Sequence, residues 1–256
     1  MTEAARYTAA EILAILSARQ LRDGQVVFAG VGIPLLAATL AQRLHCPGLT
    51  ILFEGGVVGA FVEPGKLPPS TNDQRCTKRA NMVLGSADVL LLLQRGYVDV
   101  GFMGGAQIDR FGNLNSSYIG DPASPKTRLP GTGGGNDISS LTNMIVAMKH
   151  EKRRFVEKVD FITSPGFIRG GRSRAESGLP AGGMFRVITE LAVFGFDNEE
   201  RRMKVLALNP GVSREEVQDN TGFTLDFEAR TAVTEPPTEH ELQTLRLLDP
   251  ERLFTA

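Results

Sequence analysis

The residue whose type and place best suit chemistry is Glu54, which follows the short apolar run 49–53 and precedes Gly55 and Gly56. The run has the length of a buried β-strand, so the carboxylate is expected at a strand's C-terminal end, where open α/β sheets place their reactive groups. An unpaired carboxylate in apolar surroundings is costly, and the cost is tolerated where chemistry uses the group. The alternative is that Glu54 caps the turn that follows it.

Two glycine-rich segments offer backbone N–H groups to an anion. The loop AGVGIP, with Gly30 and Gly32, carries only two of the three glycines of a dinucleotide-binding fingerprint. It therefore predicts a tight turn at least as readily as a cofactor site. The segment PGTGGGND contains the run 133–135, whose N–H groups can converge on an anion or a developing oxyanion. The flanking Pro130 and Asn136 favour a shaped loop over a flexible linker.

The first elements of the chain read as a helix followed by a βα unit. Thr8 and Glu11 form a capping box that begins an amphipathic helix, which we expect to end at Gly24. Residues 25–30 predict a strand that runs into the first glycine loop, and residues 34–45, beginning with proline, predict a second helix. The apolar run before Glu54 is then the next parallel strand.

Alternation of helix and strand continues to the end of the chain. Residues 83–96 predict a helix, 99–105 predict a strand, and the loop-rich stretch 104–135 is typical of a functional region. Further elements are expected as strands in VDFITSP (159–165), RVITELAVF (186–194) and MKVLALNPG (203–211), and as helices in SREEVQDN (213–220) and EHELQ (239–243). The only linker-like stretch is 234–238. We therefore expect one α/β domain over residues 1–256, with a single open, mostly parallel sheet and flanking helices.

Composition excludes several classes of function. The 256 residues are 42% apolar and 22% charged, and the formal net charge of −1 without a basic tract argues against nucleic acid as a partner. No apolar run approaches the roughly 20 residues of a membrane-spanning helix, and the N-terminus lacks the parts of a signal peptide, so a cytoplasmic protein is expected. Cys46 and Cys76 have neither metal-ligand spacing nor a disulfide framework, which predicts two reduced thiols.

Long segments of the chain resemble the family I CoA-transferases, in particular β subunits of the glutaconate CoA-transferase type. The likeness is carried by GGAQIDRFGNLNSSYIGDPASPKTRLPGTGGGNDI, MKHEKRRFVEKVDFITSPGFI, GQVVFAGVGIPLLAATLAQR, LFEGG and PGVSREEVQDNTGFTLDFE. It implies an open α/β subunit that pairs with an α subunit in an α2β2 or larger hetero-oligomer. It also implies transfer of CoA between a short acyl-CoA and a carboxylic acid, a dicarboxylate such as glutaconate being the best guess. Coenzyme A is then the substrate, with no metal and no tightly bound cofactor.

The resemblance assigns roles to individual residues. Glu54, with Gly56 behind it, falls on the family's nucleophile, which forms a glutamyl-CoA thioester. Gly133, Gly134 and Gly135 match a glycine-rich segment whose N–H groups stabilise the oxyanion in related enzymes, Gly134 being the favoured donor. Asn113 lies near an active-site amide of relatives, although a turn former after Gly112 explains it equally well.

Residues that contact CoA are expected among Gly30, Gly32, Gly133, Lys126 and Arg128. For Lys126 and Arg128 the alternatives are that they bind a substrate carboxylate or order the glycine loop. The cluster Lys149, Lys152, Arg153 and Arg154 suits phosphate oxygens, but a solvated face or an intersubunit patch of ion pairs is the stronger interpretation. Arg169, Arg172 and Arg174 lie in a glycine-rich loop that departs from the glutaconate enzyme, so we expect them to mark a surface difference.

Relatives on this fold with other activities define the rival hypotheses. One kind decarboxylates a glutaconyl-CoA-like substrate with a cysteine in place of the glutamate, and another hydrolyses a ring in steroid catabolism with its glutamate on the partner chain. The presence of Glu54 argues against both, although a glutamate can also activate water, as in an acyl-CoA hydrolase. A chain that acts only as a non-catalytic partner subunit is the remaining alternative. The segment VVGAFVEPGKLPPS after Glu54 differs from the glutaconate enzyme and is expected to line the acyl pocket.

Overall fold

The computed structural model of the chain describes residues 7–256, so part of the N-terminal segment on which the signal-peptide expectation rests lies outside the described residues. The internal contacts group the chain into two compact units, one ending at Phe102 and resuming at Pro236, the other formed by Met103–Glu235. The second boundary falls within the predicted linker 234–238. The single domain over 1–256 stays a prediction. None of the described helices is long and apolar enough to cross a membrane.

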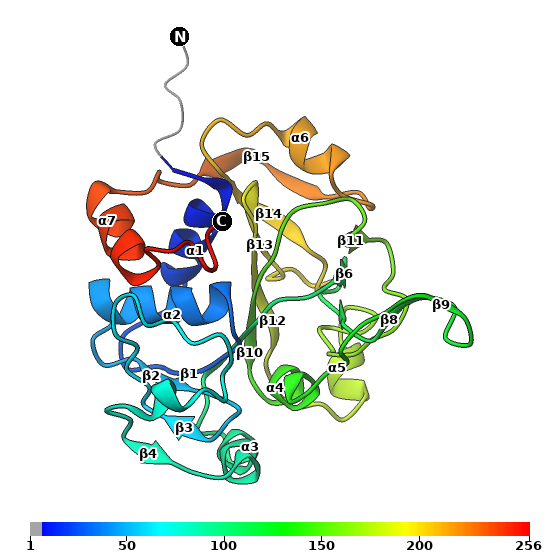
Figure 1. The fold of residues 1–256 in the computed structure, drawn as a ribbon. Helices are drawn as coiled ribbons and strands as arrows, with labels where there is room; N and C mark the ends of the chain where they lie inside the picture. Colours follow the sequence, from blue (N-terminus) through cyan, green and yellow to red (C-terminus); the bar gives the residue numbers. More distant parts are fainter. Residues whose placement is uncertain (1–6) are drawn as a thin grey trace. The chain divides into compact units, whose positions relative to one another are not determined.

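The first unit is a sheet with helices packed beside it (Figure 1). Its strands, in the order β4-β3-β2-β1-β5, are Met82–Val83, Val57–Val58, Thr50–Leu52, Val26–Ala29 and Val100–Met103. Its helices are α1 Ala9–Ala18, α2 Ile33–Leu44, α3 Ser86–Gln94, α7 Glu239–Leu248 and the 3-10 turn Gln74–Thr77. Strand β1 is parallel to both β2 and β5, and α2 begins with proline as predicted. The predicted order of helix, strand, glycine loop, helix and parallel strand is therefore confirmed.

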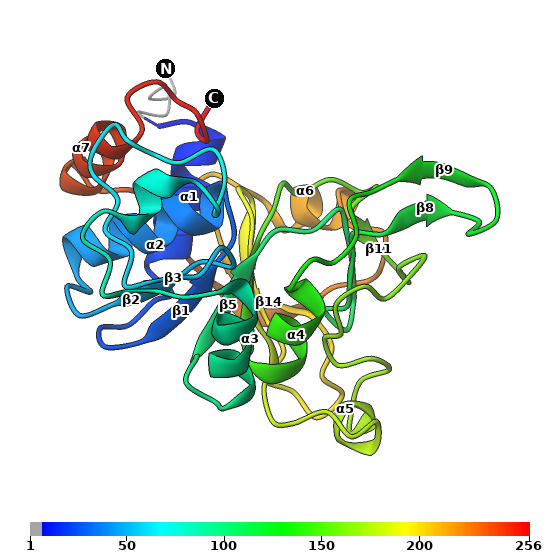
Figure 2. The same ribbon diagram turned by 60° about the horizontal axis from the view of Figure 1, so that its bottom comes forward.

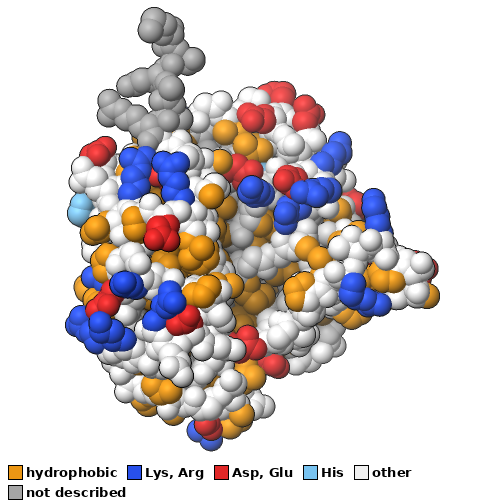
Figure 3. All heavy atoms as spheres, in the orientation of Figure 1, with side chains coloured by type: hydrophobic (Ala, Val, Ile, Leu, Met, Phe, Trp, Pro, Cys, Tyr) orange, Lys and Arg blue, Asp and Glu red, His pale blue; other side chains and the backbone are white. Residues whose placement is uncertain are grey.

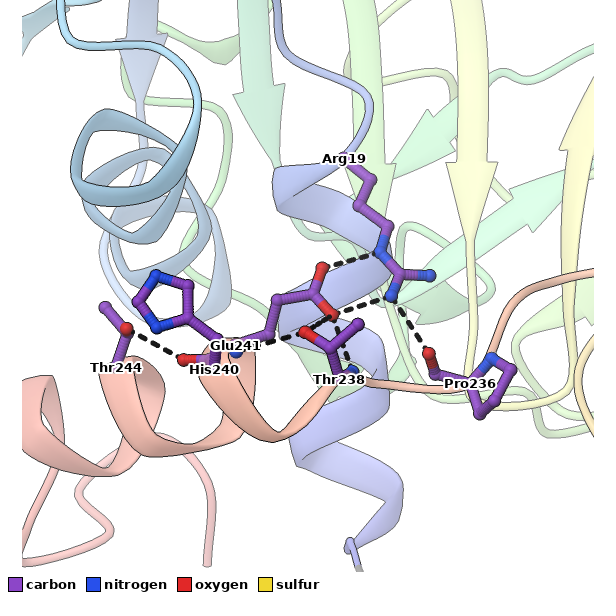
Figure 4. A network of polar contacts seen from close by, with 6 residues as sticks. All are labelled: Arg19, Pro236, Thr238, His240, Glu241 and Thr244. Carbon is purple, nitrogen blue, oxygen red and sulfur yellow. Dashed lines mark hydrogen bonds and ion pairs between the residues drawn. The ribbon is translucent and has the colours of Figure 1, made fainter.

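Helices α1 and α7 are joined by two ion pairs, in each of which a glutamate in the first turn of one helix binds an arginine at the end of the other. The predicted capping box of α1 is present, and its Glu11 carboxylate also accepts a hydrogen bond from Arg246 Nε of α7 at 2.7 Å. The capping-box carboxylate of α7, Glu241, accepts two 2.7 Å bonds from the Arg19 guanidinium, which follows α1 (Figure 4). Each carboxylate thus caps one helix and binds the other, which fixes the C-terminal helix to the start of the chain.

The second unit carries one larger and two small sheets. The strands of the larger sheet, in the order β10-β12-β13-β14-β15, are Asn143–Ala147, Gly183–Ile188, Ala192–Gly195, Lys204–Leu208 and Asp226–Val233. The small sheets contain β11 Phe155–Val156, β6 Gln107–Asp109 and β7 Leu114–Asn115, and the hairpin β8 Tyr118–Gly120 with β9 Pro125–Arg128. The helices are α4 Gly135–Leu141, α5 Ser173–Glu176 and α6 Arg214–Asp219. The α/β class with a mostly parallel sheet and flanking helices is confirmed, with antiparallel pairing at β3, β4, β13 and part of β12 and β14.

Several predicted elements differ from the structure. The strand predicted over 159–165 is reduced to one bridge between Leu114 and Ser164. The strand does not form because polar side chains of this segment make its hydrogen bonds. The Asp160 carboxylate accepts the N–H of Gly120 at 3.0 Å, in place of the backbone hydrogen bonds of a sheet. The strand predicted over 186–194 is a hairpin of β12 and β13, because Thr189 Oγ1 accepts two N–H groups of the turn.

Two smaller differences concern ends and loops. The first helix ends at Ala18 with Arg19 as its C-cap, and Gly24 lies in the later turn before β1 with φ of 77°. The loop-rich stretch 104–135 contains the short strands β6 to β9. Isolated strands of two to four residues leave almost no periodic signal in a sequence.

Candidate active site

Glu54 lies in the tight turn that joins β2 to β3. The N–H of Gly56 donates to the Phe53 carbonyl at 3.0 Å, and the N–H of Phe53 donates to the Val57 carbonyl at 2.9 Å. Strand β2 ends at Leu52 and runs parallel to β1, so the carboxylate stands just beyond the C-terminal end of a parallel strand, as predicted. The Glu54 side chain is half-buried. The element that follows this turn is the strand β3, and the catalytic role of Glu54 stays a prediction.

The two glycines after Glu54 are required by close backbone neighbours. A Cβ on Gly55 would lie 2.5 Å from Asn72 Oδ1 and 2.7 Å from the Thr71 carbonyl oxygen. A Cβ on Gly56, whose φ is 105°, would overlap the carbonyl oxygen of Leu84. The Leu84 N–H also donates to the Gly56 carbonyl at 2.8 Å. The turn that carries the carboxylate is therefore held on two sides by backbone.

The segment after Glu54 borders a pocket of about 320 Å³ in the first unit. Its lining residues are Phe61, Val62, Glu63, Lys66, Pro68, Arg75, Cys76 and Lys78. The Phe61 ring has the guanidinium carbons of Arg43 and Arg79 at 4.1 and 4.2 Å from its centre. The expectation that residues 57–70 line an acyl pocket stays a prediction, now with a cavity in the same segment.

Neither cysteine is placed to act as a nucleophile. Cys46 and Cys76 are both free and buried, which agrees with two thiols outside any disulfide. Burial raises the pKa of the Cys76 thiol to about 11 and also raises the pKa of Cys46. Both thiols are therefore protonated near neutral pH.

The glycine loop of the second unit leads directly into α4, for which Gly134 is the N-cap. The N–H of Gly131 donates to the Ser116 carbonyl and Ser116 Oγ donates to the Gly131 carbonyl, both at 2.8 Å. Thr132 holds the other side, because its carbonyl accepts the Gly135 N–H at 2.8 Å and its Oγ1 accepts the Asn136 N–H at 2.6 Å. This is a shaped loop, as predicted, and not a flexible linker.

Within this loop, Gly133 and Gly135 differ in how closely other atoms approach them. Gly133 has φ of 50°, and among the hydrogen bonds of residues 7–256 none uses its N–H group. Gly135 is buried, and a Cβ there would lie 3.3 Å from both Met103 Sδ and Thr132 Oγ1. The loop thus offers a donor at its bend and is tightly packed where the helix begins.

The Asn113 amide is engaged by its own neighbourhood. Its Nδ2 donates to both carboxylate oxygens of Asp109, at 3.1 and 2.9 Å, and to the Ile168 carbonyl at 2.8 Å. Its Oδ1 accepts the N–H groups of Gly166 and Ile168 at 2.9 and 3.0 Å. Burial raises the pKa of the Asp109 carboxyl. This geometry favours the turn-forming alternative for Asn113 over contact with a substrate.

The residues predicted to contact CoA are spread over both units. Gly32 is the N-cap of α2 with φ of 89°, and no atom lies within 4 Å of the position that a Cβ would take, so only its backbone conformation requires glycine. The N–H of Gly30 donates to the Phe102 carbonyl at 3.0 Å. Lys126 and Arg128 lie on the hairpin β8–β9, which reaches out from the rest of the second unit in Figure 2. Their roles stay predictions.

Two arginines of the basic cluster around residue 150 share one carboxylate. The Glu151 carboxylate accepts bonds from Arg153 Nε at 2.7 Å and Arg154 Nε at 3.1 Å, and the hydrogen bond from Arg153 is the main cause that lowers its pKa. Basic, acidic and apolar side chains are interspersed on the face shown in Figure 3. The ion pairs of Arg153 and Arg154 favour the solvated-face interpretation over a phosphate site.

The sequence interpretation missed several residues that hold the glycine loop. Thr132 lies two residues before the N-cap Gly134, too far from the helix for a capping signal in the sequence. Ser116 gives no signal either, because it is distant in sequence. Arg174 was expected at the surface, and this was wrong: its side chain is buried, with a residue exposure of 5%.

Comparison with known proteins identifies the family of this chain. Residues 10–220 match the sequence profile described as coenzyme A transferase. The chain belongs to the coenzyme A transferase family. One of the subunits of 3-oxoadipate CoA-transferase from Pseudomonas knackmussii is 40% identical to it over 95% of this chain and 94% of that protein. A CoA-transferase is thus an enzyme class that the sequence, the fold and the relatives support together.

Solved structures of this family share the fold of the chain. One of the subunits of glutaconate CoA-transferase from Acidaminococcus fermentans is 37% identical over 99% of this chain and 97% of that protein. The crystal structure of that enzyme superimposes with a TM-score of 0.91 over 98% of both chains. The crystal structure of the decarboxylase AibA/AibB superimposes with a TM-score of 0.82 at 26% identity, covering 96% of this CoA-transferase chain and 97% of the other.

Proposed function

We propose that this chain is the nucleophile-bearing β subunit of a CoA-transferase that moves CoA between a short acyl-CoA and a carboxylic acid. The observation that carries the proposal is the fixed turn of Glu54 at the end of a parallel strand. Both transferase relatives are single subunits of larger enzymes, so the working enzyme includes an α subunit, in an α2β2 or larger assembly. Its setting is the cytoplasm.

The proposed reaction runs through a thioester on Glu54. The carboxylate attacks the acyl-CoA carbonyl, the C–S bond breaks, and CoA thiolate leaves a mixed anhydride. The thiolate then attacks the glutamyl carbonyl and releases the first acid as its carboxylate. The acceptor carboxylate attacks the glutamyl-CoA thioester, and the same steps in reverse return a free Glu54 and a new acyl-CoA.

A carboxylate is a weak nucleophile, so orientation and oxyanion stabilisation must supply most of the rate. The turn between Phe53 and Gly56 supports orientation, because steric contact with backbone leaves the carboxylate's attachment point little freedom. We assign oxyanion donation to the N–H group of Gly133 in the 133–135 loop, because the Gly135 N–H already donates to the Thr132 carbonyl. The hydrogen bonds of Thr132 and Ser116 hold this loop in a fixed form. Coenzyme A acts as substrate in this scheme.

A dicarboxylate is the proposed acid. The two transferase relatives carry the names of 3-oxoadipate and glutaconate, both of which are dicarboxylic acids. A second carboxylate on the substrate calls for a cation at the far end of the acyl pocket. Lys66, in the segment proposed to bind the acyl group, and Arg75, which follows that segment, are cations that line the 320 Å³ pocket.

A hydrolase or decarboxylase is the second candidate, because the structure of the decarboxylase AibA/AibB shares the fold. In a hydrolase, water replaces the acceptor acid and CoA is released without a new thioester. In a decarboxylase, carbon dioxide is released and the thioester survives. Neither leaves CoA attached to Glu54.

The deciding experiment is an intact-mass measurement of this chain assembled with its α subunit and incubated with short and dicarboxylic acyl-CoAs without acceptor. The proposal expects a mass gain of CoA less water in the wild type, none in Glu54→Gln, and the full gain in the control Glu239→Gln. Glu239 is a suitable control because it lies in the same unit, at the exposed start of α7, where its carboxylate accepts a hydrogen bond from Gln243 at 2.9 Å. Free CoA or carbon dioxide without adduct would establish the second candidate instead.

A further inference from the structure

Arg174, at the start of α5, is a buried arginine bound only to backbone carbonyls. Its Nε donates to the Pro180 carbonyl at 3.1 Å, and its Nη1 donates to the carbonyls of Gly166 at 2.9 Å and Pro165 at 3.3 Å. Nη2 donates to the carbonyls of Ser139 and Ser140 at 3.0 and 2.7 Å. Among the residues that the structure describes, no carboxylate pairs with this guanidinium.

Two of these carbonyls belong to the last turn of α4. The final four carbonyls of a helix have no partner within the helix, and Ser139 and Ser140 are two of them in α4. A guanidinium there satisfies both groups and faces the negative end of the helix. Arg174 therefore caps the C-terminal end of the helix whose N-cap is Gly134.

The other carbonyls join α4 to the segment 163–166. At the start of the helix, Asn136 Nδ2 donates to the Thr163 carbonyl at 3.1 Å. At its end, Arg174 ties the Pro165 and Gly166 carbonyls to the last turn. A helix of seven residues is only about 10 Å long, so fixing both ends against one segment also fixes the position of the glycine loop that leads into it.

The buried position of the Arg174 guanidinium is unfavourable for a charged group. Burial of a guanidinium without a counter-charge is unfavourable until hydrogen bonds offset the lost hydration. A neutral side chain would avoid this cost, but no neutral side chain can donate to carbonyls in three separate segments at once. The planar guanidinium of arginine carries five N–H donors in a fixed geometry, and this allows one side chain to bind all three segments.

We infer that Arg174 is a positioning residue of the proposed transferase: its guanidinium clamps α4 to segment 165–166 and so orients the glycine loop 133–135 with the N–H group of Gly133. The inference rests on the proposed function, in which that loop stabilises the oxyanion. Arg174 touches no reacting atom. Its effect is expected in turnover more than in substrate affinity.

The test compares Arg174→Lys and Arg174→Gln with the matched pair Arg172→Lys and Arg172→Gln in the assembled enzyme. Lysine keeps the charge but concentrates its donors on one atom, and glutamine keeps a single donor group. We expect both Arg174 variants to lose kcat by about ten- to a hundredfold, the loss that a misplacement of about 1 Å produces, with KM for acyl-CoA within about twofold. Arg172 is exposed and two residues away, so its variants should match the wild type.

Two further measurements separate this role from general damage. Amide hydrogen exchange should speed up in residues 133–141 of Arg174→Gln but not in β14, whereas equal acceleration in both would overturn the inference. The rate at which CoA adduct forms on Glu54 should fall with kcat, and a variant that keeps the wild-type rate would also overturn it. Failure of the proposed function itself shows differently, as a wild-type enzyme that forms no adduct.

Discussion

The Glu54 turn and the glycine loop 133–135 are both glycine-rich, but they are held in place by opposite means. Around Glu54 the backbone of residues 71–72 and of Leu84 approaches so closely that a Cβ has no space. Around the glycine loop, hydrogen bonds that involve the side chains of Ser116, Thr132 and Asn136 fix the chain. The position of Glu54 depends on the lack of side chains at Gly55 and Gly56, whereas the form of the glycine loop depends on polar side chains.

The same contrast extends to the units that contain them. Most of the buried polar side chains lie in the second unit, including Asp109, Asn113, His150 and Arg174. Buried polar groups stabilise only while every partner remains in place. We therefore expect the first unit to be sensitive to added atoms and the second to be sensitive to lost hydrogen bonds and to pH.

The largest effect is expected for Gly56→Ala. The added methyl would overlap the Leu84 carbonyl oxygen and would require a φ of 105° from an L residue. We expect a loss of several kcal/mol in the free energy of unfolding and loss of the Glu54 adduct, because overpacking and backbone strain add. Urea denaturation and intact mass measure the two effects.

The control for Gly56 is Gly24→Ala in the same unit. Gly24 has φ of 77° but no atom within 4 Å of its Cβ position, so its variant carries the backbone strain without the overlap. A cost of about 1 kcal/mol is expected there. Equal costs at the two positions would show that close approach does not fix the Glu54 turn, and the contrast between the regions would be lost.

The second effect is a pH dependence from His150, a buried residue of the second unit. Its ring nitrogens lie 3.2 Å from Thr189 Oγ1 and 2.9 Å from Thr221 Oγ1, and its ring stacks on Phe155. Burial lowers the pKa of His150 to about 4 from 6.5. The unfolded chain therefore binds an extra proton between these values, and stability present above pH 6.5 is lost as the pH falls toward 4, by up to about 1.4 kcal/mol per pH unit.

The measurement is the free energy of unfolding between pH 4.5 and 7 for the wild type and His150→Gln. The difference between the two should grow smaller at low pH, because only the wild type loses the His150 contribution. The Asp109 carboxyl, whose pKa burial raises, contributes a slope of opposite sign, which cancels in this difference. His240→Gln, at an exposed position of the first unit, should keep the wild-type slope. Parallel curves for wild type and His150→Gln would refute the assignment.

Sequence reasoning worked best where local signals determine structure. The capping box at Thr8, the proline that opens α2 and the strand before Glu54 each produce a pattern within a few residues. Long segments of family likeness then supplied the fold and the enzyme class. The turn that carries Glu54 belongs with these, because an apolar run followed by two glycines marks a strand end.

Sequence reasoning failed where partners are distant in the chain. Arg174 looked like a surface arginine because its carbonyl partners lie up to 35 residues away. The segment 159–165 has the apolar content of a strand, but Asp160 and Thr163 bond to other loops instead. A long-range hydrogen bond leaves no periodicity, so neither outcome was available from spacing alone.

The smallest effect, and the sharpest test of how the loop is held, is expected for Thr132→Val. Valine keeps the shape but removes the Oγ1 that accepts the Asn136 N–H at 2.6 Å, and loss of such a hydrogen bond costs about 1 kcal/mol. We expect turnover to fall by about tenfold while the Thr132→Ser control keeps the wild-type rate, because serine retains the acceptor. If Thr132→Val and Thr132→Ser turn over alike, packing rather than hydrogen bonding holds this loop. The glycine loop would then resemble the Glu54 turn, and both would be fixed by close contact.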